Sequence, residues 1–341
     1  MDRYRFSLNV ERGFLLLPLL LVLASAPLSH AQTGQWTPER NVEIVVGTGP
    51  GSGPDITARL ILKIWQEQRA VNAPLVVINK PGAGNVIAWN YLNEHAGDGH
   101  YLMVGNVNLS TGYLAGTSTL SYRDLSPVAM LFNEFTVFIV NGDSPMKTAA
   151  DLIERLKADP TSVSLGVSTA IGGPNHLAGA IPLKEKGVEI KKMRTVAFRS
   201  GGQSVTALLG KHVDLVVVSP SVALPHIKSG KVRALAVLSS SRLRRDLADV
   251  PTWRELGVPS VLAKYRIMIG PKGMTREQIA FWEAQFARLS ENEEWMKVIA
   301  ENLWEAEYMK SRETLRYMEE THKQVEDAMS ALGLLKQPSP R

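Results

Sequence analysis

Short apolar runs alternate with amphipathic segments along most of the chain. An apolar run at 41–47 is followed by residues 56–69, whose large apolar side chains fall on one helical side. The pattern predicts further strands at 74–79, 101–106, 128–133, 135–141, 162–168, 192–198, 213–219 and 232–238. It predicts further helices at 84–95, 148–157, 174–185 and 202–209. Strands that alternate with helices are typical of an α/β fold with largely parallel sheets.

The last part of the chain has a helical pattern. Residues 275–278 (TREQ) form a capping box, and an apolar stripe at helical spacing follows it. A second stripe extends from Leu315 to Met329. We interpret the Trp, Phe and Met residues of these stripes as core positions and not as a cofactor site.

Two turn-rich breaks, at 141–145 and 257–260, flank a central α/β block. They predict one discontinuous domain, 32–141 with 259–341, and an inserted domain at 142–258. Chain crossings near Asn141 and Gly257 would then act as a hinge. The alternative is a single continuous sheet.

The first 31 residues have the features of an export signal. A basic start with Arg3, Arg5 and Arg12 precedes an apolar stretch at 14–26, and the small residues around His30 allow cleavage before Gln32. The apolar stretch is too short to span a bilayer comfortably, and no later segment is apolar enough to do so. We therefore expect a mature chain that is secreted to the periplasm and is not embedded in the membrane.

Composition and charge exclude several kinds of site. The chain has no cysteine, so disulfides, thiolate metal sites and cysteine nucleophiles are excluded. The formal net charge is +5, and removal of residues 1–31 lowers it to +4. This mild excess suits a small anionic ligand. No basic arm with interleaved aromatic residues is present, so we expect no nucleic-acid partner.

Polar loops of small residues follow six of the predicted strands. In parallel sheets such loops line the crevice where ligands bind, and together they indicate a cleft between two domains. The first loop, 47–55, precedes a helix and offers backbone N–H groups to an anion. It matches neither the G-x-G-x-x-G nor the Walker pattern, so nucleotide binding is not supported and no cofactor is expected. Asp55 is interpreted as the helix N-cap, with a direct ligand contact as the alternative.

Five ordered motifs between 42 and 334 resemble those of the solute receptors of tripartite tricarboxylate transporters, the Bug family. They are 50–55 (PGSGPD), 77–84 (VINKPGAG), 96–101 (AGDGHY), 172–179 (GGPNHLAG) and the signature at 200–215. Ser52 stands where the family usually has Gly. The resemblance implies a two-lobed periplasmic binding fold that holds a small carboxylate between its lobes and docks on the permease subunits in the membrane.

The resemblance also implies the binding residues. In the family, backbone groups of the first two loops hold one carboxylate, partly through ordered water. The residues expected on one lobe are Ser52, Gly53, Pro54, Asp55, Gly82, Ala83, Gly84 and Asn108. Those expected on the other lobe are Ser168, Thr169, His176, Arg199, Ser200, Gly201 and Asp214. For His176 a hydrogen bond at the helix start is the alternative, and for Arg199 a solvated loop charge.

Rival functions are weighed against this one. A sensor that presents its ligand to a membrane signalling protein would have the same fold. Ser168 follows a strand within a G-x-S-x-A sequence, so a hydrolase that uses Ser168 with Asp214 and a histidine is a further alternative. A metal site at His95, Asp98 and His100 is disfavoured, because these residues read as a solvated turn.

Overall fold

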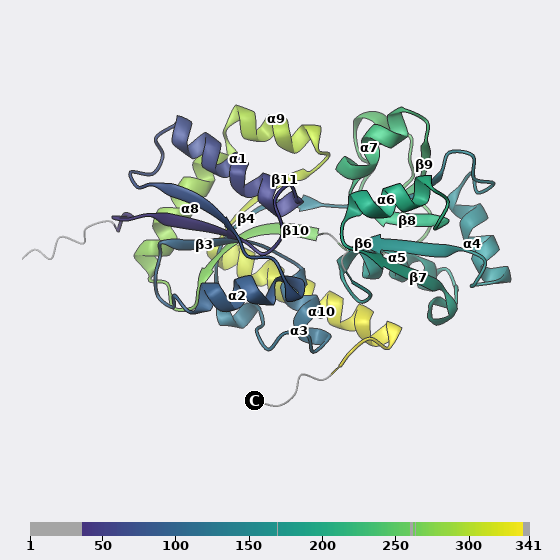
Figure 1. The fold of residues 1–341 in the computed structure, drawn as a ribbon, viewed down its shortest axis with the longest axis horizontal. Coiled ribbons are helices and arrows are strands. Elements are labelled where there is room, and N and C mark those ends of the chain that lie inside the picture. The colour runs from purple at the N-terminus through teal and green to yellow at the C-terminus, as the bar shows by residue number, and fades with distance from the viewer. Residues whose placement is uncertain (1–35, 169, 260–261, 263, 337–341) are drawn as a thin grey trace, which may run out of the picture. The chain divides into compact units, whose positions relative to one another are not determined.

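Two β-sheets organise the chain in the computed structural model (Figure 1). The structure describes residues 36–168, 170–259, 262 and 264–336. The predicted signal peptide, 1–31, lies outside the described residues. We call the six-stranded sheet with its helices the first lobe, and the five-stranded sheet with its helices the second lobe. The predicted α/β class is confirmed, and the alternative of a single continuous sheet is wrong.

The first sheet has the strand order β11-β4-β10-β3-β1-β2. Its strands are β1 (Val42–Val46), β2 (Leu75–Asn79), β3 (Tyr101–Asn106), β4 (Leu125–Glu134), β10 (Lys264–Pro271) and β11 (Glu305–Lys310). β1 is parallel to β2 and β3, and β10 lies antiparallel between β3 and β4. The ends of β1 to β4 therefore reach the same edge of the sheet as the beginning of β10.

Helices cover both faces of the first sheet, which explains its nearly continuous apolar strands. In β1, Val42, Ile44 and Val46 pack on one face and Val45 packs on the other. The first face is covered by α1 (Gly53–Glu67), α8 (Arg276–Ser290) and α9 (Glu293–Glu301) (Figure 1). The second face is covered by α2 (Val86–Asn93), α3 (Asn108–Leu114) and α10 (Ser311–Leu332).

The second sheet has the order β7-β6-β8-β5-β9. Its strands are β5 (Thr136–Asn141), β6 (Ser164–Ser168), β7 (Arg194–Phe198), β8 (Leu215–Val218) and β9 (Val232–Leu238). Its helices are α4 (Ala149–Ala158), α5 (Pro174–Glu185), α6 (Gly201–Leu209) and α7 (Pro220–Lys228). Short 3₁₀ turns lie between elements of the first lobe at η1 (Ala83–Asn85) and η2 (Tyr122–Asp124). Two more, η3 (Ile190–Lys192) and η4 (Arg245–Leu247), lie in the part of the chain between β5 and β10. α6 and α7 pack on one face, and α4 and α5 pack on the other.

The chain passes between the sheets at the edge where the polar loops lie. β4 ends at Glu134 and β5 begins at Thr136, so Phe135 alone joins the two sheets there. The return passage runs from the end of β9 to Lys264 at the start of β10. The first crossing was predicted after Asn141, but Asn141 is the last residue of β5, inside the second sheet. Its turn signals mark a loop at the far end of that strand, not a change of lobe.

The remaining differences concern elements whose sequence pattern is weak. The predicted strands are observed with small shifts at their ends. The strands β10 and β11 and the helices α3, α7 and α9 were not predicted. In the described part of the chain, no helix is long and apolar enough to cross a membrane.

Candidate ligand-binding site

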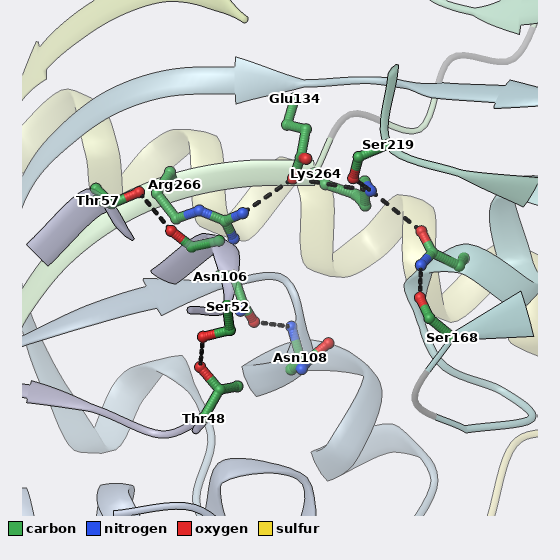
Figure 2. A network of polar contacts seen from close by, with 12 residues as sticks. Thr48, Ser52, Thr57, Asn106, Asn108, Glu134, Ser168, Ser219, Lys264 and Arg266 are labelled. Carbon is green, nitrogen blue, oxygen red and sulfur yellow. Dashed lines mark hydrogen bonds and ion pairs between the residues drawn. The ribbon is translucent and has the colours of Figure 1, made fainter. Parts of the chain in front are cut away.

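The first loop connects β1 to α1 and is fixed by short polar contacts (Figure 2). The hydroxyls of Thr48 and Ser52 share a hydrogen bond of 2.5 Å. Ser52 is the N-cap of α1, and its hydroxyl accepts a hydrogen bond from the Asp55 N–H at 3.4 Å. Gly53 and Pro54 are the first residues of the helix. The positive end of the α1 dipole therefore lies at the edge of the first sheet.

Asp55 ties this loop to the second one. Its carboxylate, 2% exposed, accepts hydrogen bonds from Gly51 N at 2.8 Å, Arg59 Nε at 2.9 Å and Asn79 Nδ2 at 2.8 Å. Burial by itself raises the pKa of Asp55, but these donors together bring the pKa below its ordinary value. The prediction that Asp55 is the N-cap is therefore wrong, because Ser52 has that position. Asp55 is a buried anchor whose oxygens are already occupied.

The exchange Asp55→Asn is expected to lower the free energy of unfolding by about 2 kcal/mol near neutral pH, because it removes a charged acceptor from three donors. A lowered pKa stabilises the fold above the ordinary value of 3.8. That stabilisation disappears as the pH falls through the lowered pKa. The difference between the two proteins in urea unfolding should therefore shrink on acidification. The control Asp249→Asn changes an exposed aspartate, so its stability near neutral pH should lie within about 0.5 kcal/mol of the parent protein. A pH-independent difference would contradict this assignment.

The second loop, between β2 and α2, has an unusual backbone. Gly82, Ala83, Gly84 and Asn85 have φ angles of 136°, 46°, 65° and 86°. Left-handed angles at Ala83 and Asn85 cost about 1 kcal/mol each and need support from the surroundings. Asn85 is buried, and its Oδ1 lies 2.7 Å from where a Cβ on Gly47 would be. The loop therefore packs on the end of β1, which only glycine at 47 permits.

The third loop starts at the end of β3. The side chain of Asn106 accepts a hydrogen bond from Asn108 N at 2.9 Å, where α3 begins. Asn106 is paired in register with Arg266 of β10. The third loop thus lies next to a strand that brings charged side chains to the same edge.

A buried cluster of charges occupies the centre of this edge (Figure 2). Arg266 Nη2 donates to Glu134 Oε2 at 2.9 Å, and Lys264 Nζ lies 3.7 Å from the same oxygen. Each side chain is less than a tenth exposed. Burial raises the pKa of Glu134, but the two cations hold it below its usual range. We call Glu134, Lys264 and Arg266 the charge cluster.

Lys264 also links the charge cluster to the second lobe. Its Nζ donates to Ser219 Oγ at 2.9 Å and to Asn175 Oδ1 at 3.1 Å. Asn175 in turn donates to the hydroxyl of Ser168 at the end of β6. A continuous series of polar contacts therefore runs from Arg266 on the first sheet to Ser168 on the second (Figure 2).

The other residues predicted on the second lobe have different surroundings. His176 is buried, its Nδ1 accepts a hydrogen bond from Gly172 N at 3.0 Å, and burial lowers its pKa. Ser200 is the N-cap of α6, and Gly201 begins that helix. Arg199 is exposed at the end of β7. Thr169 lies outside the described residues.

Asp214 lies away from the site. It precedes β8, and its carboxylate accepts hydrogen bonds from Ser164 N at 2.8 Å and Ser164 Oγ at 2.6 Å. Ser164 begins β6 and Ser168 ends it. The structure thus places Asp214 at the opposite end of the sheet from Ser168, so a hydrolytic pair of these two residues is not assembled. The resemblance implied Asp214 as a site residue, but in the structure Asp214 precedes β8, whereas the polar loops described above follow their strands.

The charge cluster was missed from the sequence, although a signal exists. Lys264 and Arg266 are two residues apart and directly precede the apolar run 267–269, so in a strand they share one face. Basic residues on the same face at the start of a buried strand require a carboxylate or an anionic ligand. Glu134 lies between the predicted strands 128–133 and 135–141, where the sequence pattern assigns it no role.

Two cavities in the described structure lie away from these loops. One of about 540 Å³ is lined mainly by α5 and α10, and one of about 230 Å³ is lined by residues such as Asn133 and Tyr317. None of the loop residues predicted for the site lines either cavity. The strand edges are the candidate site, because the start of α1 and the buried charges converge there.

Two α/β lobes, joined by polar contacts between the edges that carry their loops, define the class of two-lobed periplasmic binding proteins. A family model described as "Tripartite tricarboxylate transporter family receptor" matches residues 61–334. The chain belongs to this family, whose members are non-enzymatic solute receptors.

Individual proteins are similar to this chain in sequence or in fold. Protein BugT of Bordetella pertussis is 30% identical over 272 residues, which cover 78% of this chain and 80% of BugT. Periplasmic binding protein BugD has a TM-score of 0.76 at 24% identity, covering 88% of this chain and 100% of that chain. R. palustris Rpa4515 with adipate has a TM-score of 0.77 at 24% identity, covering 87% and 98%. MatC from Rhodopseudomonas palustris with bound malate has a TM-score of 0.70 at 22% identity, covering 85% and 99%.

Proposed function

We propose that this receptor binds a small carboxylate between its two lobes, at the sheet edges where the polar loops lie, and delivers it to the permease subunits of a tripartite transporter. Export through the signal at 1–31 would bring the mature chain to the periplasm, where this delivery takes place. Family membership supports the transporter partner. The bound adipate and malate of two structural relatives support a carboxylate as the ligand class.

The observation that carries the proposal is the position of Arg266 against the start of α1. Its Nη2 lies 3.3 Å from where a Cβ on Gly53 would be. A buried guanidinium and the positive end of a helix thus adjoin the loop that the family uses for its ligand. Both favour an anion with oxygen atoms at that point.

Calorimetric titration of the mature protein with mono-, di- and tricarboxylates tests ligand binding. A ligand should also raise the melting temperature as its concentration increases. If no carboxylate binds, the proposed ligand class is wrong. Uptake of the labelled ligand by cells with and without the receptor tests the delivery step.

The exchanges Gly53→Ala and Gly53→Val should weaken carboxylate binding in order of size. A Cβ at this position approaches Arg266, and the branched side chain of valine fills the space in front of the helix start. We expect a loss of about tenfold or more for Val, the equivalent of one charged hydrogen bond. Circular dichroism and the melting temperature without ligand should stay near those of the parent protein. A folded Val variant with unchanged affinity would show that the ligand does not reach Gly53.

A further inference from the structure

The charge cluster holds more positive than negative charge. Two cations share the Glu134 carboxylate, and all three side chains are buried. Asp55, the buried carboxylate of the first loop, is already paired with Arg59. Among the residues that the structure describes, no ion pair other than those with Glu134 involves Lys264 or Arg266. One buried positive charge therefore lacks a counter-ion, and an unpaired buried charge is costly.

The two cations differ in how well neutral groups satisfy them. Lys264 donates to Asn175 and Ser219 in addition to its contact with Glu134. Arg266 is 5% exposed, and its Nε is a buried donor with no partner in the described structure. An arginine stays charged at any physiological pH, so it cannot escape this cost by losing a proton. Arg266 is thus the member of the cluster with a buried donor, Nε, that lacks an acceptor.

We propose that Arg266 pairs directly with the carboxylate of the ligand, and that the surplus positive charge of the cluster excludes ligands with an ammonium group beside that carboxylate. This inference rests on the proposed function and adds a side-chain partner to the backbone loops. Glu134 positions the guanidinium by holding Nη2. Arg266 is then the specificity-determining residue of the site.

The exclusion of amino acids follows from the groups around Gly53 and Arg266 at the start of α1. An α-ammonium needs a carboxylate or carbonyl acceptor, and the two buried carboxylates described for this edge are Asp55 and Glu134. The oxygens of Asp55 already accept from Gly51, Arg59 and Asn79. The Glu134 carboxylate is already shared by Arg266 and Lys264. An ammonium group would therefore meet Arg266 and the positive end of α1 without compensation.

Matched pairs of ligands test the proposal by calorimetry. Succinate and aspartate differ by one ammonium group, and so do glutarate and glutamate. The parent protein should bind the member without the ammonium group about tenfold more tightly or better, as expected for an uncompensated like charge. Equal or tighter binding of aspartate or glutamate would overturn the exclusion. Failure of every carboxylate to bind would instead remove the proposed function itself.

Variants at the cluster test the role of Arg266. Arg266→Gln should weaken binding of the preferred carboxylate by about ten- to a hundredfold, and Arg266→Lys should recover part of that loss. Lys264→Gln removes the same charge at similar burial, and its loss should be the smaller one because Lys264 does not face Gly53. If Arg266→Gln does not fold, the affinity of Arg266→Lys for the preferred carboxylate tests the role of Arg266. An unchanged affinity in a folded Arg266 variant, or an equal loss in Lys264→Gln, overturns the proposal.

Discussion

Replacing Glu134 with Gln is expected to lower the free energy of unfolding by about 3 kcal/mol, because two buried cations lose their shared counter-charge. Glutamine has nearly the same shape as glutamate, so the loss reports charge and not packing. Guanidinium chloride unfolding followed by circular dichroism measures it. A loss below about 1 kcal/mol would show that the cluster is already neutralised in the parent protein.

A second exchange restores the charge balance. In the double variant Glu134→Gln with Lys264→Met, Arg266 is the one charged side chain left in the cluster. The double variant should therefore be more stable than Glu134→Gln alone. Double-mutant cycles measure such coupling directly, and contacting groups usually show coupling energies of about 0.5–3 kcal/mol. Independent, additive effects of the two exchanges would contradict the shared contact.

The effect of the Glu134 exchange should also depend on pH. Burial lowers the pKa of Lys264 from its ordinary value of 10.5, while Glu134 opposes that shift. Without Glu134, the pKa of Lys264 falls further, and the unfolded chain binds more protons than the folded one above that pKa. Stability of the variant should therefore rise with pH up to the ordinary value, and its deficit should shrink.

Truncation of Trp282 to Ala should destabilise the first lobe by about 4 kcal/mol, the range found for large buried aromatic residues. The Trp282 side chain is fully buried, stacks on Trp65 at 5.6 Å between ring centroids, and donates from Nε1 to Gly99 O at 2.8 Å. Its removal leaves a cavity and an unsatisfied carbonyl where α8 meets α1 and the turn before β3.

Two comparisons separate packing from general effects. Trp282→Phe keeps an aromatic ring but loses the N–H donor, so its loss of stability should be clearly smaller than that of Trp282→Ala. Met296→Ala changes an exposed apolar residue on α9 and should lie within about 0.5 kcal/mol of the parent protein. Denaturant unfolding measures all three. Similar losses for Ala and Phe would show that the hydrogen bond to Gly99 dominates over packing.

The sequence predicts those parts of the fold that have a local pattern. Apolar runs such as 41–47 and the glycine-rich loops after them are visible without any tertiary information, so the α/β class and the loop edges were predicted. The strand β10 begins with Lys264 and Arg266, whose charges conceal the buried strand. Charge burial depends on a partner distant in the sequence, here Glu134, and no periodicity reports such a pairing.

Two expectations for the second sheet did not account for strand direction. The boundary after Asn141 was predicted from a turn-rich break, and the site role of Asp214 was implied by the family resemblance. In the structure, Asn141 ends β5 and Asp214 precedes β8, both at the end of the second sheet opposite to Ser219. Which end of a strand meets the ligand follows from the direction of the strand in its sheet. That direction is set by pairings between distant segments.

The position of β10 has a consequence for how the chain reaches its native state. This strand lies between β3 and β4 in the first sheet, yet the whole second sheet separates it from both along the chain. Contacts between distant segments form slowly, because the intervening loop must close first. We therefore expect the second lobe to become protected against hydrogen exchange before the first during refolding. The lobe that contains the first strand would be the last to be completed.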